Sequence, residues 1–217
     1  MDLKGKKVLF LGDSITEGVG VSSPAKKYTS VFSDISGASV YNYGISGTRI
    51  ATQHKPTVDN PRFDITFGSR VADMHDECDV VVVFGGTNDF GHGDAPIGVF
   101  TDRTEYSFYG ALHNLIISLV NKYSNAKIVF MTPLHRDGEN STKSANRGFR
   151  PALVEYVKAI REVCEYYSIP VLDLYATSGL QPAIPIIKQK FMPDGLHPSD
   201  AGAEIIAHRL YGFLTAL

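Results

Sequence analysis

Two short segments, far apart in the sequence, carry side chains that could perform nucleophilic catalysis. The first reads GDS at 12–14 and ends in Ser14, and the second reads DGLHP at 194–198 and contains Asp194 and His197. A carboxylate three residues before a histidine can hold the imidazole from behind and stabilise the imidazolium, which a serine nucleophile requires from its base. Each segment also has a purely structural interpretation, because Ser14 could cap a helix and a histidine before a proline often begins one.

Two further segments supply hydrogen-bond donors. They read YNYGISGT at 41–48 and GGTND at 85–89, and they include Gly47 and Asn88. A glycine N–H and an asparagine amide are suitable donors to the oxyanion that develops during acyl transfer. Glycine and asparagine are also common turn formers, so either segment could serve only as a turn.

Five apolar runs must position these segments. The runs lack the alternation of a half-exposed strand, which indicates strands covered on both faces, as in a parallel sheet between two layers of helices. Apolar stripes with helical spacing follow each run. The runs span 7–11, 38–44, 79–86, 127–133 and 170–174, and the stripes span 28–35, 67–74, 108–123, 153–167 and 205–213. This order predicts an α/β fold, a three-layer α/β/α sandwich with a five-stranded parallel sheet.

The length and composition are those of an ordinary globular protein. At roughly 150 residues per domain, 217 residues predict a single domain over 1–217. The chain has 21 basic and 23 acidic residues and a formal net charge of −2, which offers no electrostatic case for binding nucleic acid or an anionic membrane. Cys78 and Cys164 have no CxxC partner, so we expect two reduced core thiols.

The N-terminal segment favours a cytoplasmic location. Its apolar run has only four residues before Gly12, which is too short for a secretory signal, and no stretch of the chain reads as a membrane span. A secreted or periplasmic location would follow if a signal peptide had been removed. The sequence carries no signal for an oligomeric state.

Together, the four segments resemble the conserved blocks of the SGNH hydrolases, also called the GDSL esterase/lipase family. GDS matches the first block, ISGT the second, GGTND the third and DGLHP the last, and they occur in the same order over residues 12–198. The first block reads GDSI where the family name has GDSL, which exchanges one apolar residue for another. The resemblance implies a flavodoxin-like sandwich, an ester hydrolase activity, and no cofactor or metal.

The resemblance also implies a role for each matching residue. Ser14 would be the nucleophile, His197 would be the general base and then the acid, and Asp194 would orient His197. The Ser14 N–H, the Gly47 N–H and the Asn88 side chain would form the oxyanion hole.

Motifs of other enzyme classes are incomplete. The chain has no GxSxG elbow, no third glycine after the GVG at 18–20, and no GK[ST]. The HRD at 135–137 stands without the other kinase motifs. His92 and Asp94 could contribute to a metal site, but no second pair of ligands has a standard spacing, so a solvated loop is the interpretation we favour.

Long polar stretches at 52–64, 88–104, 135–150 and 175–193 must determine the substrate, because loops of this length are usually functional. They and their neighbours carry Arg49, His92, Asp94, Arg136, Asn146 and Arg147, together with the aromatic residues Phe90 and Phe191. From this set and the segments above, we select as candidate substrate contacts Asp13, Arg49, His92, His135, Arg136 and Phe191.

No long apolar stretch suggests a tunnel for an acyl chain. We therefore expect hydrolysis of short-chain acyl esters, acetyl esters first, of a small polar or carbohydrate substrate. The alternatives are a short-chain acyl thioesterase or a lysophospholipase of the same family. A non-enzymatic glycan-binding module is a further alternative, which the intact Ser14, Asp194 and His197 disfavour.

Overall fold

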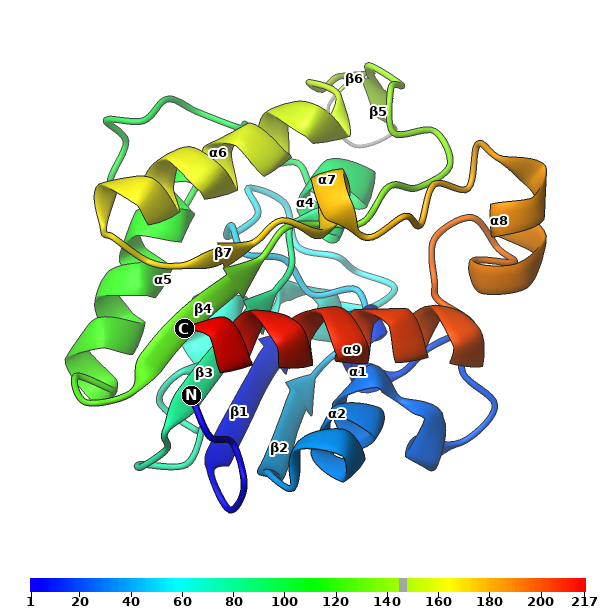
Figure 1. The fold of residues 1–217 in the computed structure, drawn as a ribbon. Helices are drawn as coiled ribbons and strands as arrows, with labels where there is room; N and C mark the ends of the chain where they lie inside the picture. The colour runs from blue at the N-terminus through cyan, green and yellow to red at the C-terminus, as the bar shows by residue number, and fades with distance from the viewer. Residues whose placement is uncertain (145–147) are drawn as a thin grey trace.

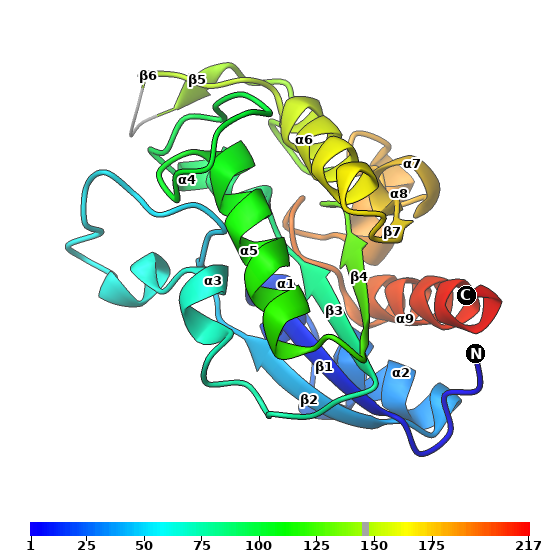
Figure 2. The same cartoon turned by 90° about the vertical axis from the view of Figure 1, so that its left-hand side faces the viewer.

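The computed structural model describes residues 1–144 and 148–217 and shows a parallel five-stranded sheet. The sheet order is β2-β1-β3-β4-β7. Its strands are β1 (Lys7–Gly12), β2 (Ser39–Gly44), β3 (Val80–Phe84), β4 (Lys127–Met131) and β7 (Val171–Leu172). The predicted fold class is confirmed, and the sheet lies between two layers of helices (Figures 1 and 2).

The register of the central strands aligns the segments that were singled out in the sequence. Gly12 at the end of β1 pairs with Gly44 of β2 on one side and with Phe84 of β3 on the other. The GDS, ISGT and GGTND segments therefore all leave the sheet at its carboxyl edge, where open α/β sheets bind ligands.

Two apolar layers cover the faces of the sheet. In β3, Val81 and Val83 belong to the layer under α3 (Phe67–Arg70), α5 (Phe108–Lys122) and α6 (Leu153–Tyr166). Val80 and Val82 belong to the opposite layer, under α2 (Tyr28–Ser36) and α9 (Asp200–Ala216). Successive strand residues point to opposite faces, so a run of valines serves both layers.

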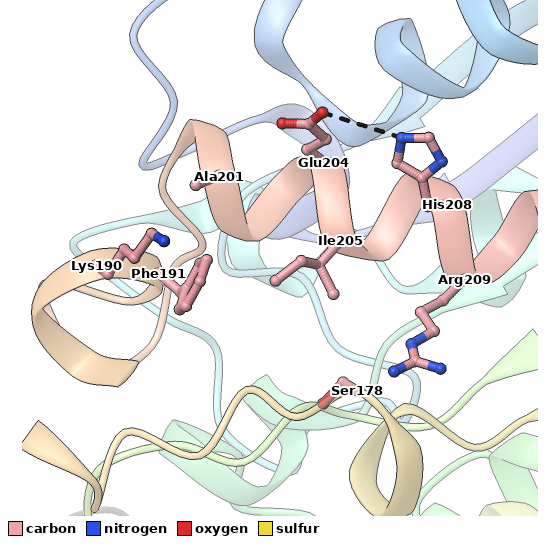
Figure 3. Close-up of a pocket in the computed structure, with 8 residues that line it drawn as sticks. All are labelled: Ser178, Lys190, Phe191, Ala201, Glu204, Ile205, His208 and Arg209. Atoms are coloured by element: carbon pink, nitrogen blue, oxygen red, sulfur yellow. Dashed lines mark ion pairs between the residues drawn. The ribbon is translucent and has the colours of Figure 1, made fainter. Parts of the chain in front are cut away.

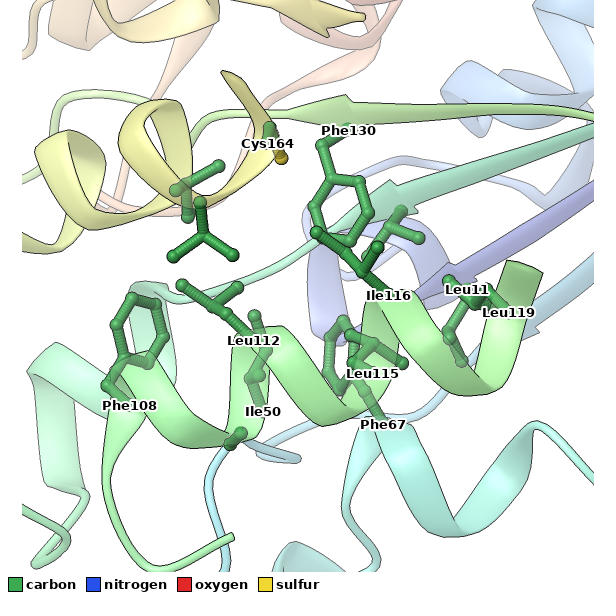
Figure 4. Packing of buried hydrophobic residues seen from close by; sticks show 14 of the residues in the cluster. Leu11, Ile50, Phe67, Phe108, Leu112, Leu115, Ile116, Leu119, Phe130 and Cys164 are labelled. Atoms are coloured by element: carbon green, nitrogen blue, oxygen red, sulfur yellow. The ribbon is translucent and has the colours of Figure 1, made fainter. Parts of the chain in front are cut away.

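The long helix α5 illustrates how the predicted stripes pack. Leu112, Leu115, Ile116 and Leu119 lie on one side of this helix and face the sheet around Phe130 (Figure 4). Each of these side chains is at most 1% exposed. Burying a side chain of this size contributes roughly 1.5–3 kcal/mol, so this face holds α5 on the sheet.

Several helix ends follow the expected chemistry. Gly37 ends α2 in a left-handed conformation with φ of 68°, and the Ser199 hydroxyl caps α9 by accepting from the Gly202 N–H at 3.4 Å. Pro24 opens the separate 3₁₀ helix η1 (Pro24–Lys26), which precedes α2.

The structure also contains short elements that the sequence patterns did not predict. They occupy the polar stretches and are η2 (Pro61–Asp64), α4 (Thr87–His92), the β5 (Lys143–Ser144) and β6 (Gly148–Phe149) hairpin, α7 (Leu174–Thr177) and α8 (Pro185–Phe191). The short helix α1 (Ser14–Glu17) follows β1 after the single residue Asp13. The last strand is shorter than the predicted 170–174 because Asp173 caps α7, accepting from the Ala176 N–H at 3.1 Å.

Both cysteines are free thiols, and burial raises the pKa of Cys164 to about 12. No helix within residues 1–144 and 148–217 has the length and apolar character needed to cross a membrane.

Candidate active site

Ser14, His197 and Asp194 form a chain of hydrogen bonds at the carboxyl edge of the sheet. Ser14 Oγ lies 2.9 Å from His197 Nε2, although the two residues are 183 positions apart. His197 Nδ1 lies 2.6 Å from Asp194 Oδ2. The other carboxylate oxygen, Asp194 Oδ1, accepts from the backbone N–H groups of Leu196 at 2.8 Å and His197 at 2.7 Å.

The protonation of Asp194 determines the direction of these bonds. Partial burial opposes ionisation, but the hydrogen bonds from the His197 side chain, the His197 N–H and the Leu196 N–H together lower the pKa of Asp194 below its ordinary value. An ionised carboxylate only accepts, so His197 Nδ1 donates to it and Nε2 is left to accept from the Ser14 hydroxyl. This is the tautomer in which a histidine can remove a proton from a serine.

The three predicted oxyanion donors are all buried at the same edge. Within residues 1–144 and 148–217, the N–H groups of Ser14 and Gly47 have no acceptor. Gly47 has φ of 76°, and a Cβ at this position would lie 2.1 Å from the Phe63 ring, so only glycine fits. Asn88 Nδ2 donates one hydrogen to Thr48 O at 3.0 Å, which leaves its second hydrogen for a ligand.

The loop that carries Gly47 is held by buried charged groups whose role the sequence did not reveal. Asp89 accepts from the N–H groups of Ile50 at 3.0 Å and Ala51 at 2.9 Å. Arg70 Nη2 donates to Thr48 Oγ1 at 3.1 Å.

Arg70 also ties this loop to the strands. Its Nη1 donates to Gly12 O at 3.0 Å and to Tyr43 O at 2.5 Å, which are carbonyls at the ends of β1 and β2. Glu17, in the helix that begins with Ser14, accepts from the Ser46 N–H at 2.6 Å. Asp89 belongs to the GGTND segment that was singled out in the sequence. The partners of Arg70 and Glu17 are distant in sequence and could not be anticipated.

Asp13, another of the predicted substrate contacts, directly precedes the nucleophile and is only 1% exposed. Its Oδ1 accepts from the Ile15 N–H at 3.0 Å and so caps α1. Burial raises the pKa of Asp13 to about 7, against the lowering effects of this hydrogen bond and of the nearby Arg70. Burial likewise raises the pKa of Asp89 above its ordinary value.

Of the predicted substrate contacts, His92 is the last residue of α4, and Arg49 lies against it. Arg49 is 3% exposed and forms an ion pair with Asp64 at 2.6 Å. Its Nη1 also lies 3.3 Å from His92 Nδ1. Burial and the charge of Arg49 lower the pKa of His92 to about 4, so His92 is neutral near pH 7. Asp94 accepts from the N–H of His54 at 2.8 Å.

His135 and Arg136 lie on the segment after β4, and each has its own partner. His135 Nδ1 lies 2.9 Å from Glu139 Oε2, and its ring stacks against Tyr175 with centroids 3.8 Å apart. Arg136 Nη1 donates to Thr87 O at 3.0 Å.

The two aromatic residues of the long polar stretches lie elsewhere. Phe90 is 1% exposed and belongs to the core. Phe191 is the last residue of α8 and, together with residues of α9, lines a separate pocket of about 700 Å³ (Figure 3). None of the residues that line this pocket is Ser14, Asp194 or His197. Asn146 and Arg147 fall outside the described residues.

Among the residues that the structure describes, no three His, Cys, Asp or Glu side chains are grouped so that they could hold a metal ion. The site as arranged can supply a hydroxyl nucleophile, a base with an oriented tautomer, and several N–H donors.

Comparison with known proteins agrees with the fold and the motifs. The sequence matches the GDSL-like Lipase/Acylhydrolase family over residues 10–205. One solved structure is 37% identical with a TM-score of 0.85, covering 100% of this chain and 99% of its own. A protein from Lactobacillus plantarum is 29% identical with a TM-score of 0.82, covering 98% of both chains. No curated protein matches the sequence.

A more distant structure shares the fold at lower identity. The acetyl xylan esterase AlAXEase is 21% identical with a TM-score of 0.63, covering 95% of this chain and 98% of its own. The family match spans nearly the whole sequence, so the chain belongs to the GDSL-like Lipase/Acylhydrolase family and is an ester hydrolase at family level.

Proposed function

We propose that the protein hydrolyses short-chain acyl esters, acetyl esters above all, of a small polar or carbohydrate substrate through Ser14, His197 and Asp194. The observation that carries this proposal is the continuous chain of hydrogen bonds, 2.9 Å from Ser14 to His197 and 2.6 Å from His197 to Asp194. A serine hydroxyl becomes an effective nucleophile only when a base in this arrangement removes its proton.

The steps follow from the positions of the protons. His197 Nε2 takes the proton of Ser14 Oγ as that oxygen attacks the ester carbonyl, and Asp194 stabilises the resulting imidazolium. The N–H groups of Ser14 and Gly47 and the free amide hydrogen of Asn88 donate to the oxyanion. The tetrahedral intermediate then collapses: its C–O bond to the alcohol breaks, the imidazolium gives its proton to the departing alcohol, and the acyl group stays on Ser14 Oγ. Water, which gives a proton to His197, attacks this acyl group, and the acid leaves as Ser14 Oγ takes the proton back.

The preference for a short acyl group and a polar alcohol rests on the surroundings of the site. Arg49 and His92 at the end of α4 and Arg136 after β4 have charged or polar side chains. The aromatic Phe90 is buried in the core. The fold is shared with an acetyl xylan esterase, which is consistent with an acetylated carbohydrate as substrate. A lysophospholipase would require a longer apolar contact surface for its acyl chain.

The test is a series of 4-nitrophenyl esters from acetate to decanoate, assayed with the wild-type enzyme and with Ser14→Ala. We expect Ser14→Ala to lower kcat by about 10³–10⁶. We also expect kcat/KM to be highest for the acetyl or propionyl ester, since a true acyl tunnel would gain about 0.8 kcal/mol with each buried CH₂. A maximum at eight carbons or more would overturn the short-acyl proposal, and retained hydrolysis by Ser14→Ala would overturn the serine mechanism.

A further inference from the structure

Arg136 spans the space between the base and the oxyanion donors. The residue after it, Asp137, donates its N–H to Gly195 O at 2.7 Å, so the backbone of Arg136 runs beside the turn that holds Asp194 and His197. Its side chain reaches the opposite side of the site, where Nη1 donates to Thr87 O at 3.0 Å and to Thr87 Oγ1 at 3.1 Å. Thr87 directly precedes the candidate oxyanion donor, so the guanidinium borders the place where an ester must lie.

The guanidinium has donor capacity that the described protein does not use. Arg136 takes part in none of the ion pairs within residues 1–144 and 148–217. Nη2 has no partner among these residues and keeps some solvent exposure, whereas Nε is buried without a partner. A partly buried arginine is normally paired with an anion or has its donors satisfied.

Two other buried arginines, Arg49 and Arg70, have partners within the protein for their terminal nitrogens. Arg49 is paired with Asp64 at 2.6 Å. Arg70 donates through Nε, Nη1 and Nη2 to backbone and hydroxyl oxygens. Arg136 differs from both in its two terminal nitrogens. Nη1 donates to Thr87, whereas Nη2 has no partner among the described residues and lies at the edge of the candidate active site.

The nearby carboxylates do not neutralise this charge by direct contact. Asp194 is bonded to His197, and Asp137 is paired with Lys188. Asp13 is buried in the cap of α1. Burial and the nearby charge of Arg150 lower the pKa of Arg136, while these three carboxylates act only from a distance to raise it.

We propose that Arg136 binds an anionic group of the ester substrate, a carboxylate or a phosphate, through Nη2, so that the preferred esters are negatively charged. The inference rests on the proposed ester hydrolysis and narrows its substrate class from polar esters to anionic ones. An arginine suits this role because its planar donors match the oxygens of a carboxylate or phosphate. Arg136 acts here as a specificity residue, since it does not contact the reacting bond.

The experiment compares charged esters with their neutral counterparts. For an anion on the alcohol side, the pair is 4-acetoxybenzoate and its methyl ester. For an anion on the acyl side, the pair is the 4-nitrophenyl monoester of succinate and its methyl ester. We expect Arg136→Gln to lower the ratio of kcat/KM, charged over neutral, by about 10- to 100-fold in at least one pair, mainly through KM. Arg136→Lys should give a charged-over-neutral ratio between that of the wild type and that of Arg136→Gln, because lysine keeps the charge and loses the planar geometry.

A matched control and a second readout keep this test decisive. Arg103 is exposed and donates only to carbonyls of its own loop, so Arg103→Gln should leave both ratios unchanged. If Arg136→Gln fails to fold, the wild-type enzyme still reports the contact: KM for the charged ester should rise with added NaCl while KM for the neutral ester stays constant. Competitive inhibition by benzoate or by inorganic phosphate identifies which anion binds more tightly.

The inference and the proposed function can fail separately. Calorimetric binding of 4-acetoxybenzoate and of its methyl ester to Ser14→Ala, with and without Arg136→Gln, measures recognition without turnover. The inference alone would be overturned if hydrolysis depends on Ser14 but Arg136→Gln leaves the charged-over-neutral ratio of kcat/KM unchanged in both ester pairs. Selective binding of the charged ester by a protein that shows no Ser14-dependent hydrolysis would overturn the proposed function and leave the anion site standing.

Discussion

Ser14, Gly47 and Asn88 lie on segments that are buried against the sheet, whereas Asp194 and His197 lie on a turn that follows α8 at the surface. Asn88 is 5% exposed and Ser14 is 6% exposed, but the side chain of Asp194 is 55% exposed. The first group, the nucleophile side, is held by distant partners such as Arg70 and Asp89. The second group, the base side, is held largely by hydrogen bonds within the turn itself.

We therefore expect substitutions on the two sides to affect stability and rate differently. On the nucleophile side, bonds that position a donor also join β1, β2 and the loop after β2, so a substitution there should disturb stability and rate together. On the base side, Asp194 bonds to residues only two and three positions away, so a substitution should change the rate and leave the fold intact.

The largest predicted effect lies on the base side. Asp194→Asn keeps the acceptor oxygen of the turn but no longer favours the tautomer in which His197 Nε2 can accept a proton. We expect kcat to fall by about 10⁴. The free energy of unfolding should change by less than about 1 kcal/mol, because the side chain is more than half exposed. Steady-state kinetics and urea unfolding measure both quantities, and a loss of less than tenfold in kcat would contradict the assignment.

Asn88 provides the next test, on the nucleophile side. Asn88→Ala removes a donor to the oxyanion and should lower kcat by about 10²–10³ with little change in KM. It also leaves Thr48 O without its 3.0 Å donor inside the protein, so we expect a loss of about 1–3 kcal/mol in unfolding free energy.

Asn88→Asp separates this role from that of a turn former. Aspartate keeps the size and the turn propensity of asparagine but places negative charge where the oxyanion develops. We expect it to be at least as damaging as alanine. A stably folded Asn88→Asp enzyme with unimpaired kcat would remove Asn88 from the oxyanion hole.

The last prediction concerns stability and not the rate, and it is a difference in pH dependence between the two sides. Burial raises the pKa of Asp13 from 3.8 to about 7, so between these values the folded protein holds a proton that the unfolded chain has released. Stability from this group is therefore greatest below pH 4 and falls as pH rises toward 7, by at most about 1.4 kcal/mol per pH unit. Asp194, whose pKa is lowered, has the opposite sign and loses its contribution as pH falls.

Asp13→Asn isolates this effect, since asparagine can still accept from the Ile15 N–H. The variant should gain about 1–4 kcal/mol in unfolding free energy relative to wild type between pH 4 and 8. Urea unfolding at four pH values in this range measures the gain. Parallel stability profiles for the two proteins would show that Asp13 does not titrate in this range.

The sequence predicted the strands and helices in which apolar residues recur at a regular spacing. The valines of β3 and the leucines of α5 read directly as a buried strand and an amphipathic helix because burial follows the geometry of the element itself. The helix α4 was not predicted, since its TNDFGH sequence has low helix propensity and is stabilised by contacts from Arg136 and Arg150. Local patterns carry no information about such partners.

The same limit applies to the site. Ser14, Asp194 and His197 could be selected because their residue types suit nucleophilic catalysis and because the four segments together resemble the blocks of one family. The positioning of Gly47 by Arg70 could not be inferred, because the oxygens that Arg70 binds belong to Gly12, Tyr43 and Thr48. Phe191 was selected for its residue type alone and lies in a different pocket.

The most direct test of the account is to label the nucleophile. Diethyl 4-nitrophenyl phosphate forms a bond between phosphorus and an activated serine oxygen and releases 4-nitrophenolate, and peptide mass spectrometry identifies the modified residue. We predict one diethylphosphoryl group per chain on Ser14, with loss of esterase activity in proportion to labelling and no label on Ser14→Ala. Full activity in a protein labelled completely on Ser14, or inactivation with the label on another residue, would contradict it.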